Sequence, residues 1–203
     1  FIKIAGKTIN TSWVNHEGIK REVRYRVPNK NQCKECHSTN DVISPIGPKA
    51  WNLDKDLNYG DGSKNQLAYL LQKGVIDSIP TNFQTISDWE DESQSLEDRS
   101  RAYLAINCGH CHTPSGVANS TGLYLDFNEV RPLHLGINKS PVATGRGSGN
   151  LNYSIVPGKA HESILLFRMI STDPGVMMPE SGRSLVHVEA SNLIEEWINS
   201  MEN

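Results

Sequence analysis

The chain lacks several features that mark large classes of proteins. It contains no run of roughly 18 or more apolar residues, so we expect no helix of it to span a membrane. Its formal net charge is only −3 and its pI is near 6.2, which gives no sign of a basic surface for nucleic acid or anionic lipid. No long acidic tract occurs either, so we expect no disordered acidic tail.

Apolar residues are scarce as well. Hydrophobic residues make up 37% and aromatic residues 7% of the 203 positions. This length fits one large domain or two small domains of about 100 residues each. The hydrophobic content is modest for two compact cores, and it agrees better with a fold in which a bound group supplies part of the apolar surface.

Cysteine is rare, and its placement is the most informative feature present. The pentapeptide Cys-x-x-Cys-His occurs at residues 33–37 and 108–112, and the two copies use all four cysteines. Two thiols three residues apart lie on one side of a helical turn, where they can add to both vinyl groups of one porphyrin, with the adjacent imidazole beneath the iron. The sequence therefore predicts two covalently bound haem c groups. The expected thioether links are at Cys33, Cys36, Cys108 and Cys111, and the expected proximal iron ligands are His37 and His112.

Three other uses of paired cysteines explain the sequence less well. The knuckles of a zinc ribbon normally lie about 15 to 20 residues apart, closer than Cys36 and Cys108, and the repeated histidine would be accidental. A thioredoxin-like dithiol needs one motif near a βαβ pattern, which we do not find. Structural disulfides give no reason for a histidine twice at the same place.

The separation of the two motifs predicts two modules. Their histidines are 75 positions apart (112 minus 37). We expect a first cytochrome c-like haem module within residues 1–94 and a second within 95–203. The first should begin with a short β-hairpin, because apolar and polar residues alternate on both sides of residues 15–18. The expected fold class is mainly α.

Helical patterns account for most of the remaining elements. Ser95 is expected to cap a helix that leads into the second motif, with Glu97 and Asp98 in its first turn. Gly74 should end another helix. The terminal helix should pack across the one that Ser95 begins. The helices are expected over residues 64–73, 95–108, 162–170 and 188–201.

A long loop insertion is expected in the second module. Residues 114–158 are rich in Gly, Ser, Asn and Thr, and residues 145–150 are the loosest stretch. We expect an exposed flap here, with one strand at residues 123–125.

Met178 is the candidate distal ligand of the second iron. It stands before Pro179, 66 positions after His112 (178 minus 112), and just before the terminal helix. Single-haem cytochromes c carry a Met-Pro ligand on a loop in this order. Met177 is the second choice, whereas Met169 has the helical spacing of a core residue. His/Met ligation would raise the reduction potential and favour electron transfer.

The distal ligand of the first iron stays open. No methionine lies between His37 and Cys108. The position could be filled by a histidine such as His16 or His110, by Lys49, by water, or by nothing. The other free histidines are His134, His161 and His187.

From about residue 20 to its end, the chain resembles a family of bacterial extracytoplasmic di-haem c-type cytochromes, in their C-terminal di-haem region. This family is largely uncharacterised. The resemblance implies a periplasmic or secreted protein, with a membrane anchor or a further domain possible upstream. It also implies that Arg168 pairs with a haem propionate. The matching stretches are residues 25–33, 45–49, 107–112, 168–169, 178–179 and 196–198.

Two functions of different class follow from these features. The first is an electron-transfer protein that exchanges electrons with redox protein partners, without catalytic residues of its own. The second is an enzyme of the di-haem peroxidase kind, in which the first iron is open, although no distal acid or base can be named. The chain could also be the cytochrome module of a larger redox enzyme.

Overall fold

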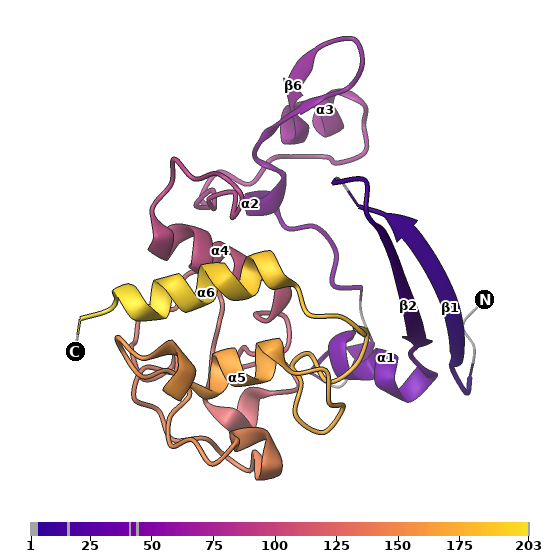
Figure 1. The fold of residues 1–203 in the computed structure, drawn as a ribbon. Coiled ribbons are helices and arrows are strands. Elements are labelled where there is room, and N and C mark those ends of the chain that lie inside the picture. Colours follow the sequence, from indigo (N-terminus) through magenta and orange to yellow (C-terminus); the bar gives the residue numbers. More distant parts are fainter. Residues whose placement is uncertain (1–3, 16, 41, 44, 203) are drawn as a thin grey trace.

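The structure is a computed structural model, and it describes residues 4–15, 17–40, 42–43 and 45–202. Three parts are visible in Figure 1: a helical body, a β-hairpin beside it, and a small lobe that carries β6 and α3. The hairpin and the end of α6 lie on opposite sides of this view.

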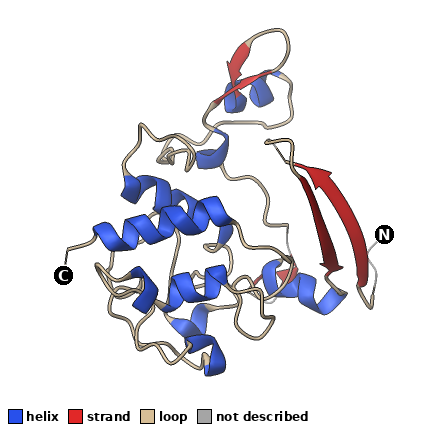
Figure 2. Ribbon diagram, in the orientation of Figure 1, coloured by secondary structure: helices blue, strands red, loops and turns tan. Residues whose placement is uncertain are grey.

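The expected mainly α fold is wrong. The described residues form six α-helices, and only α4 and α6 are longer than seven residues. Three separate two-stranded sheets and long loops make up much of the rest, as Figure 2 shows. The reason lies in the first half of the chain, where Leu67 is the one buried residue among those described before residue 95. Without more side chains to bury, this half forms no helical haem module, although the boundary near residue 94 itself stays a prediction.

The expected N-terminal hairpin is present. Strand β1 (Lys7–Val14) pairs antiparallel with β2 (Lys20–Val27), and Ile9 lies opposite Tyr25. At the turn, the backbone N–H of Ile19 donates to Asn15 Oδ1 at 2.8 Å. The hairpin is mostly exposed, and Tyr25 Oη donates to the Gly182 carbonyl at 3.3 Å.

The segment after the hairpin contains short elements only. Helix α1 (Lys30–Cys36) carries the first pentapeptide and begins with a capping box formed by Asn29 and Gln32. The expected helix over 64–73 is shorter, because residues 63–65 pair as a strand and Asn65 becomes the N-cap. The other elements are β3 (Ser38–Thr39), β4 (Val42–Ile43), α2 (Ala50–Leu53), β5 (Asp56–Asn58), β6 (Ser63–Asn65) and α3 (Gln66–Gln72).

The core is formed by three helices and the loops between them. Helix α4 (Leu96–Asn107) begins at Ser95, as expected, since the Asp98 N–H donates to its hydroxyl at 3.0 Å. The terminal helix α6 (Val188–Ser200) packs on α4 as predicted, and α5 (Ile164–Ile170) packs on α6. Trp197 Nε1 donates to Glu97 Oε2 at 2.7 Å across the α4–α6 contact. The core includes Leu104, Leu125, Ile155, Leu166, Ile194 and Trp197.

The long loop between α4 and α5 is not an exposed flap. Its residues 123–125 form no strand, because Tyr124 N donates to the His134 carbonyl at 2.8 Å and Leu125 N to the His112 carbonyl at 2.8 Å. The loop contains the 3₁₀ turns η1 (Asn119–Thr121) and η2 (Gly145–Ser148) and is followed by η3 (Ala160–Glu162). Gly147 in η2 is buried against the Arg168 guanidinium of α5. The loop therefore forms one side of the body.

None of the helices among the described residues has the length and apolar character that a membrane crossing requires.

Candidate functional site

A cavity of about 780 Å³ brings most of the predicted site residues together. Its wall is formed by the end of α1, the second pentapeptide, the following loop, α5 and the segment around Met178. Its volume is that of a site for a sizeable organic group. The predicted residues in the wall are Cys36, Cys108, Cys111, His112 and Met178, while Cys33 and His37 are not among the described residues that line it.

The second pentapeptide forms a turn directly after the end of α4. Cys108 is the C-cap, and the Cys111 and His112 amides both donate to its carbonyl, at 3.1 and 2.9 Å. The turn needs glycine at position 109, since a Cβ there would lie 2.7 Å from the Ala105 carbonyl oxygen. Both thiols and the imidazole are thereby held at the cavity wall.

His112 has the environment of a neutral nitrogen ligand. Burial lowers the pKa of its ring below the ordinary value of 6.5, which favours the uncharged imidazole. Its Nδ1 atom is buried and has no hydrogen-bond partner within the described part of the chain. A buried ring nitrogen without a partner is costly, so the ring is suited to bind a group that enters the cavity.

The two adjacent methionines differ in their surroundings. Met178 is half-buried and lines the cavity, and its amide donates to the Arg168 carbonyl at 3.1 Å. Met177 is 6% exposed and is not among the described residues of the cavity wall. Met169 belongs to the core cluster, as expected, and also reaches the wall. The structure therefore places Met178, and not Met177, in the wall of the same cavity as His112.

Arg168 places a positive charge at the cavity. Its side chain is 14% exposed, and Nε donates to the Val176 carbonyl at 2.8 Å. One terminal nitrogen lies 3.5 Å from Glu180 Oε1, so the pairing of its charge is weak. Burial lowers the pKa of Arg168, but a guanidinium remains charged in proteins. This residue can therefore pair with a carboxylate of a bound group.

The first pentapeptide has a more open environment. Cys33 and Cys36 are half-buried on α1, and His37 is its exposed C-cap. In the described residues, the His37 side chain makes no hydrogen bond. The motif presents the donor atoms that haem attachment requires, but the chain around His37 does not enclose them as it encloses His112.

The two pentapeptides touch. One ligand atom each from Cys36, His110 and Cys111 lie within 4.8 Å of one another, so this Cys-His-Cys group could bind a metal ion. The Cys111 thiol also donates to the Glu35 carbonyl at 3.2 Å. Hydrogen bonding from Cys111 and His110 lowers the pKa of Cys36, while the contact with Cys36 raises the pKa of Cys111. No sequence signal could have found this group, because Cys36 lies 74 positions before His110 and 75 before Cys111.

The other residues predicted as distal ligands of a first haem iron mostly have other contacts. His16 lies outside the described residues. The Lys49 ammonium lies over the Trp51 ring, 4.9 Å from its centroid, and 3.9 Å from Asp126 Oδ2. Three histidines have polar partners: His134 contacts Glu129, His161 contacts Glu195, and His187 contacts Tyr103.

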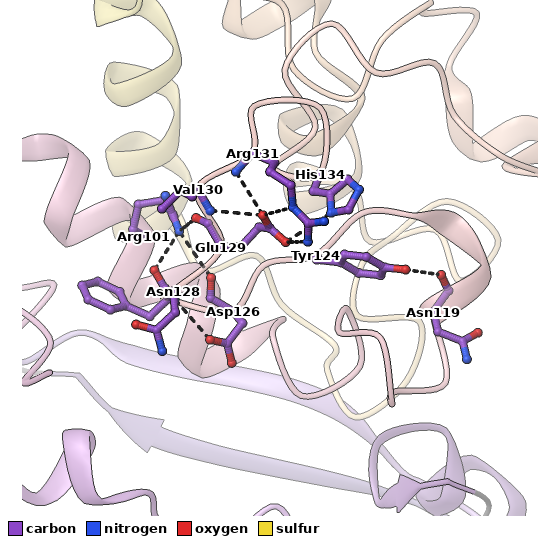
Figure 3. Close-up of polar contacts among 10 residues, drawn as sticks. Arg101, Asn119, Tyr124, Asp126, Asn128, Glu129, Val130, Arg131 and His134 are labelled. Atoms are coloured by element: carbon purple, nitrogen blue, oxygen red, sulfur yellow. Dashed lines mark hydrogen bonds and ion pairs between the residues drawn. The ribbon is translucent and has the colours of Figure 1, made fainter. Parts of the chain in front are cut away.

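A buried carboxylate stabilises the loop behind the cavity. The side chain of Glu129 is 8% exposed and accepts from Arg131 Nε and Nη2 at 2.8 and 2.6 Å, and His134 Nδ1 lies 3.2 Å away (Figure 3). The hydrogen bonds from Arg131 hold the pKa of Glu129 far below its ordinary value of 4.5. Arg101 of α4 donates to the carbonyls of residues 126, 127 and 129. These contacts fix the loop that contributes Leu125 and Leu135 to the wall.

No protein-family model matches the chain, and no curated protein and no solved structure matches it either. The resemblance to di-haem cytochromes therefore stays a prediction, based on the pentapeptides and the pieces between them.

Proposed function

We propose that the protein is a di-haem c-type cytochrome that transfers electrons to or from redox protein partners outside the cytoplasm. One observation carries the proposal: Cys108, Cys111, His112 and Met178 all line one cavity of about 780 Å³. The thiols and histidine come from one pentapeptide, and the methionine comes from a loop 66 positions later (178 minus 112). Only folding brings this donor set together.

The residues of the second motif fit haem c. Cys108 and Cys111 would hold the porphyrin through thioether links, and His112 and Met178 would supply nitrogen and sulfur ligands to the iron. The neutral ring of His112 suits a ligand histidine. Arg168 would pair with a propionate. When bound, haem c supplies one-electron oxidation and reduction at its iron.

Attachment of a second haem at the first pentapeptide is supported only by the residue types and their spacing. Cys33 and Cys36 have the same spacing as the second pair, and His37 follows directly. We propose that they hold the other haem, with a more exposed iron ligand because His37 is exposed. Haem is attached to such thiols outside the bacterial cytoplasm, and the proposed localisation follows from that.

The first test measures how many haem groups the chain carries. A pyridine haemochrome assay combined with intact mass should give two per chain, and one after Cys33 and Cys36 are both replaced by serine. A matured sample without covalent haem would overturn the proposal. A high-spin iron that binds cyanide and turns over hydrogen peroxide would favour the peroxidase alternative instead.

The second test uses the two adjacent methionines as a matched pair. Met178→Leu should lower the reduction potential of one haem by about 0.1–0.3 V, because axial ligands set potentials over about 0.8 V. Met177→Leu conserves volume in the core and should leave both potentials unchanged. Potentiometry on both variants is the measurement. Equal shifts in both variants, or a shift with Met177→Leu alone, would contradict the assignment of Met178.

A further inference from the structure

We propose that, in the haem-free chain, Cys36, His110 and Cys111 bind one Zn²⁺-class ion that joins the two pentapeptides. This site does not depend on the proposed function. It uses one cysteine of each pentapeptide, whereas haem attachment uses both cysteines of the same pentapeptide. The metal site and full haem attachment therefore exclude each other.

The distances suit this ion. Zinc binds sulfur at about 2.3 Å and imidazole nitrogen at about 2.0–2.1 Å, so tetrahedral ligand atoms lie about 3.5–3.8 Å apart. The three ligand atoms already lie within 4.8 Å of one another. Closing the site around an ion thus requires shifts of about 1 Å or less, which half-buried side chains on a short helix and a loop can make.

A second observation points to a ligand at this place. His110 Nδ1 is buried, and among the described residues it has no hydrogen-bond partner. Burial without a partner is unfavourable for such an atom. An ion bound at Nδ1 would satisfy this atom directly.

The donor set selects the metal. Two thiolates and one imidazole favour Zn²⁺ and its substitute Co²⁺ over Mg²⁺ and Ca²⁺, which prefer oxygen ligands. Both thiols must bind as thiolates, so the ion replaces two protons, which are released to solvent. Three protein ligands leave one position of a tetrahedral ion for water.

Neither of the remaining cysteines is part of the group. Cys33 lies one turn earlier on α1, and Cys108 is the C-cap of α4. All four cysteines are equivalent for haem attachment, but only Cys36 and Cys111 matter for the metal. Cys33 and Cys108 are therefore matched controls within the same chain.

The first experiment titrates the full, reduced, haem-free chain with Co²⁺. We expect a thiolate-to-cobalt absorption band that saturates at one ion per chain and disappears when Zn²⁺ is added. Cys36→Ser and Cys111→Ser should lose the band, and His110→Ala should weaken binding at least about tenfold. Cys33→Ser and Cys108→Ser should keep it. Absence of the band, or equal loss in Cys33→Ser and Cys36→Ser, would overturn the proposal.

The second experiment needs no variant and so does not depend on variant folding. Thiol alkylation is followed by peptide mass in the haem-free chain, with and without Zn²⁺. Zinc should slow the alkylation of Cys36 and Cys111 at least about tenfold and leave Cys33 and Cys108 unchanged. Protection of both cysteines of one pentapeptide would overturn it. The haemochrome assay of the matured protein is separate, so the failure of either proposal can be recognised by itself.

Discussion

At the scale of single residues, Glu129 shows how a carboxylate can stabilise a cavity that it does not line. Its hydrogen bonds from Arg131 are strongest while the carboxylate is charged. The folded protein holds the pKa of Glu129 below its ordinary value of 4.5. The stability it contributes is therefore complete above pH 4.5 and is lost as the pH falls towards the lowered folded value.

Glu129→Gln tests this at the same scale. We expect the variant to be less stable at pH 7 by about 1–3 kcal/mol, because a charged hydrogen-bond acceptor is lost from a buried place. Denaturant unfolding of both proteins at pH 7 and at progressively lower pH measures the difference, which should shrink as the wild-type carboxylate becomes protonated. A difference that stays constant with pH would show that the charge of Glu129 is not the cause.

At the scale of elements, the capping box of α1 holds the first pentapeptide in its helical turn. Gln32 N donates to Asn29 Oδ1 at 2.9 Å, and Asn29 N donates to Gln32 Oε1 at 3.0 Å. A helix of seven residues depends strongly on its cap, since it has few hydrogen bonds of its own.

Asn29→Ala should therefore destabilise α1 by about 1 kcal/mol. Amide hydrogen exchange should then speed up about fivefold at Cys33 and its neighbours, because local opening becomes easier by that amount. Asn29→Asp keeps the capping oxygen and is the control. Equal exchange rates in Asn29→Ala and wild type would mean that tertiary contacts, not the cap, hold the helix.

At the scale of the whole molecule, burial is very uneven. The apolar core belongs to α4, α5, α6 and their loops, while Leu67 is the one buried residue described before residue 95. In the haem-free chain we expect the backbone amides of α4 and α6 to be protected from hydrogen exchange at least about tenfold more than those of β1 and β2. Similar protection in both parts would show that the first half is stabilised by contacts other than core burial.

The sequence predicted some elements of the fold correctly and others wrongly. Helix α4 was predictable, since Ser95, Glu97 and Asp98 mark its start in the sequence itself. The prediction of a strand at residues 123–125 was wrong. The amides of Tyr124 and Leu125 donate to carbonyls of distant loop residues, and these contacts cannot be predicted from the local sequence.

The candidate site divides in the same way. The thiols and histidines could be predicted from the two pentapeptides, and Met178 from its place before Pro179. No comparison with known proteins tests the roles of these residues. The contact of Cys36 with His110 and Cys111 depends on tertiary folding. The requirement for glycine at position 109 also depends on the folded structure, because a side chain there would collide with the preceding turn of α4.

The position of Glu35 has a consequence for access to the cavity. Its carbonyl accepts from Cys111 at 3.2 Å, and its carboxylate accepts from the Ser181 hydroxyl at 2.9 Å, so one residue links α1 to two sides of the cavity rim. Both links are exposed hydrogen bonds, each contributing about 1 kcal/mol. Two further hydrogen bonds, from Tyr25 Oη to the Gly182 carbonyl and from Asn40 N to the Ser115 carbonyl, also hold this part of the chain to the body. We therefore expect the contacts of Glu35 to open when a flat, bulky group enters, while α1 stays attached.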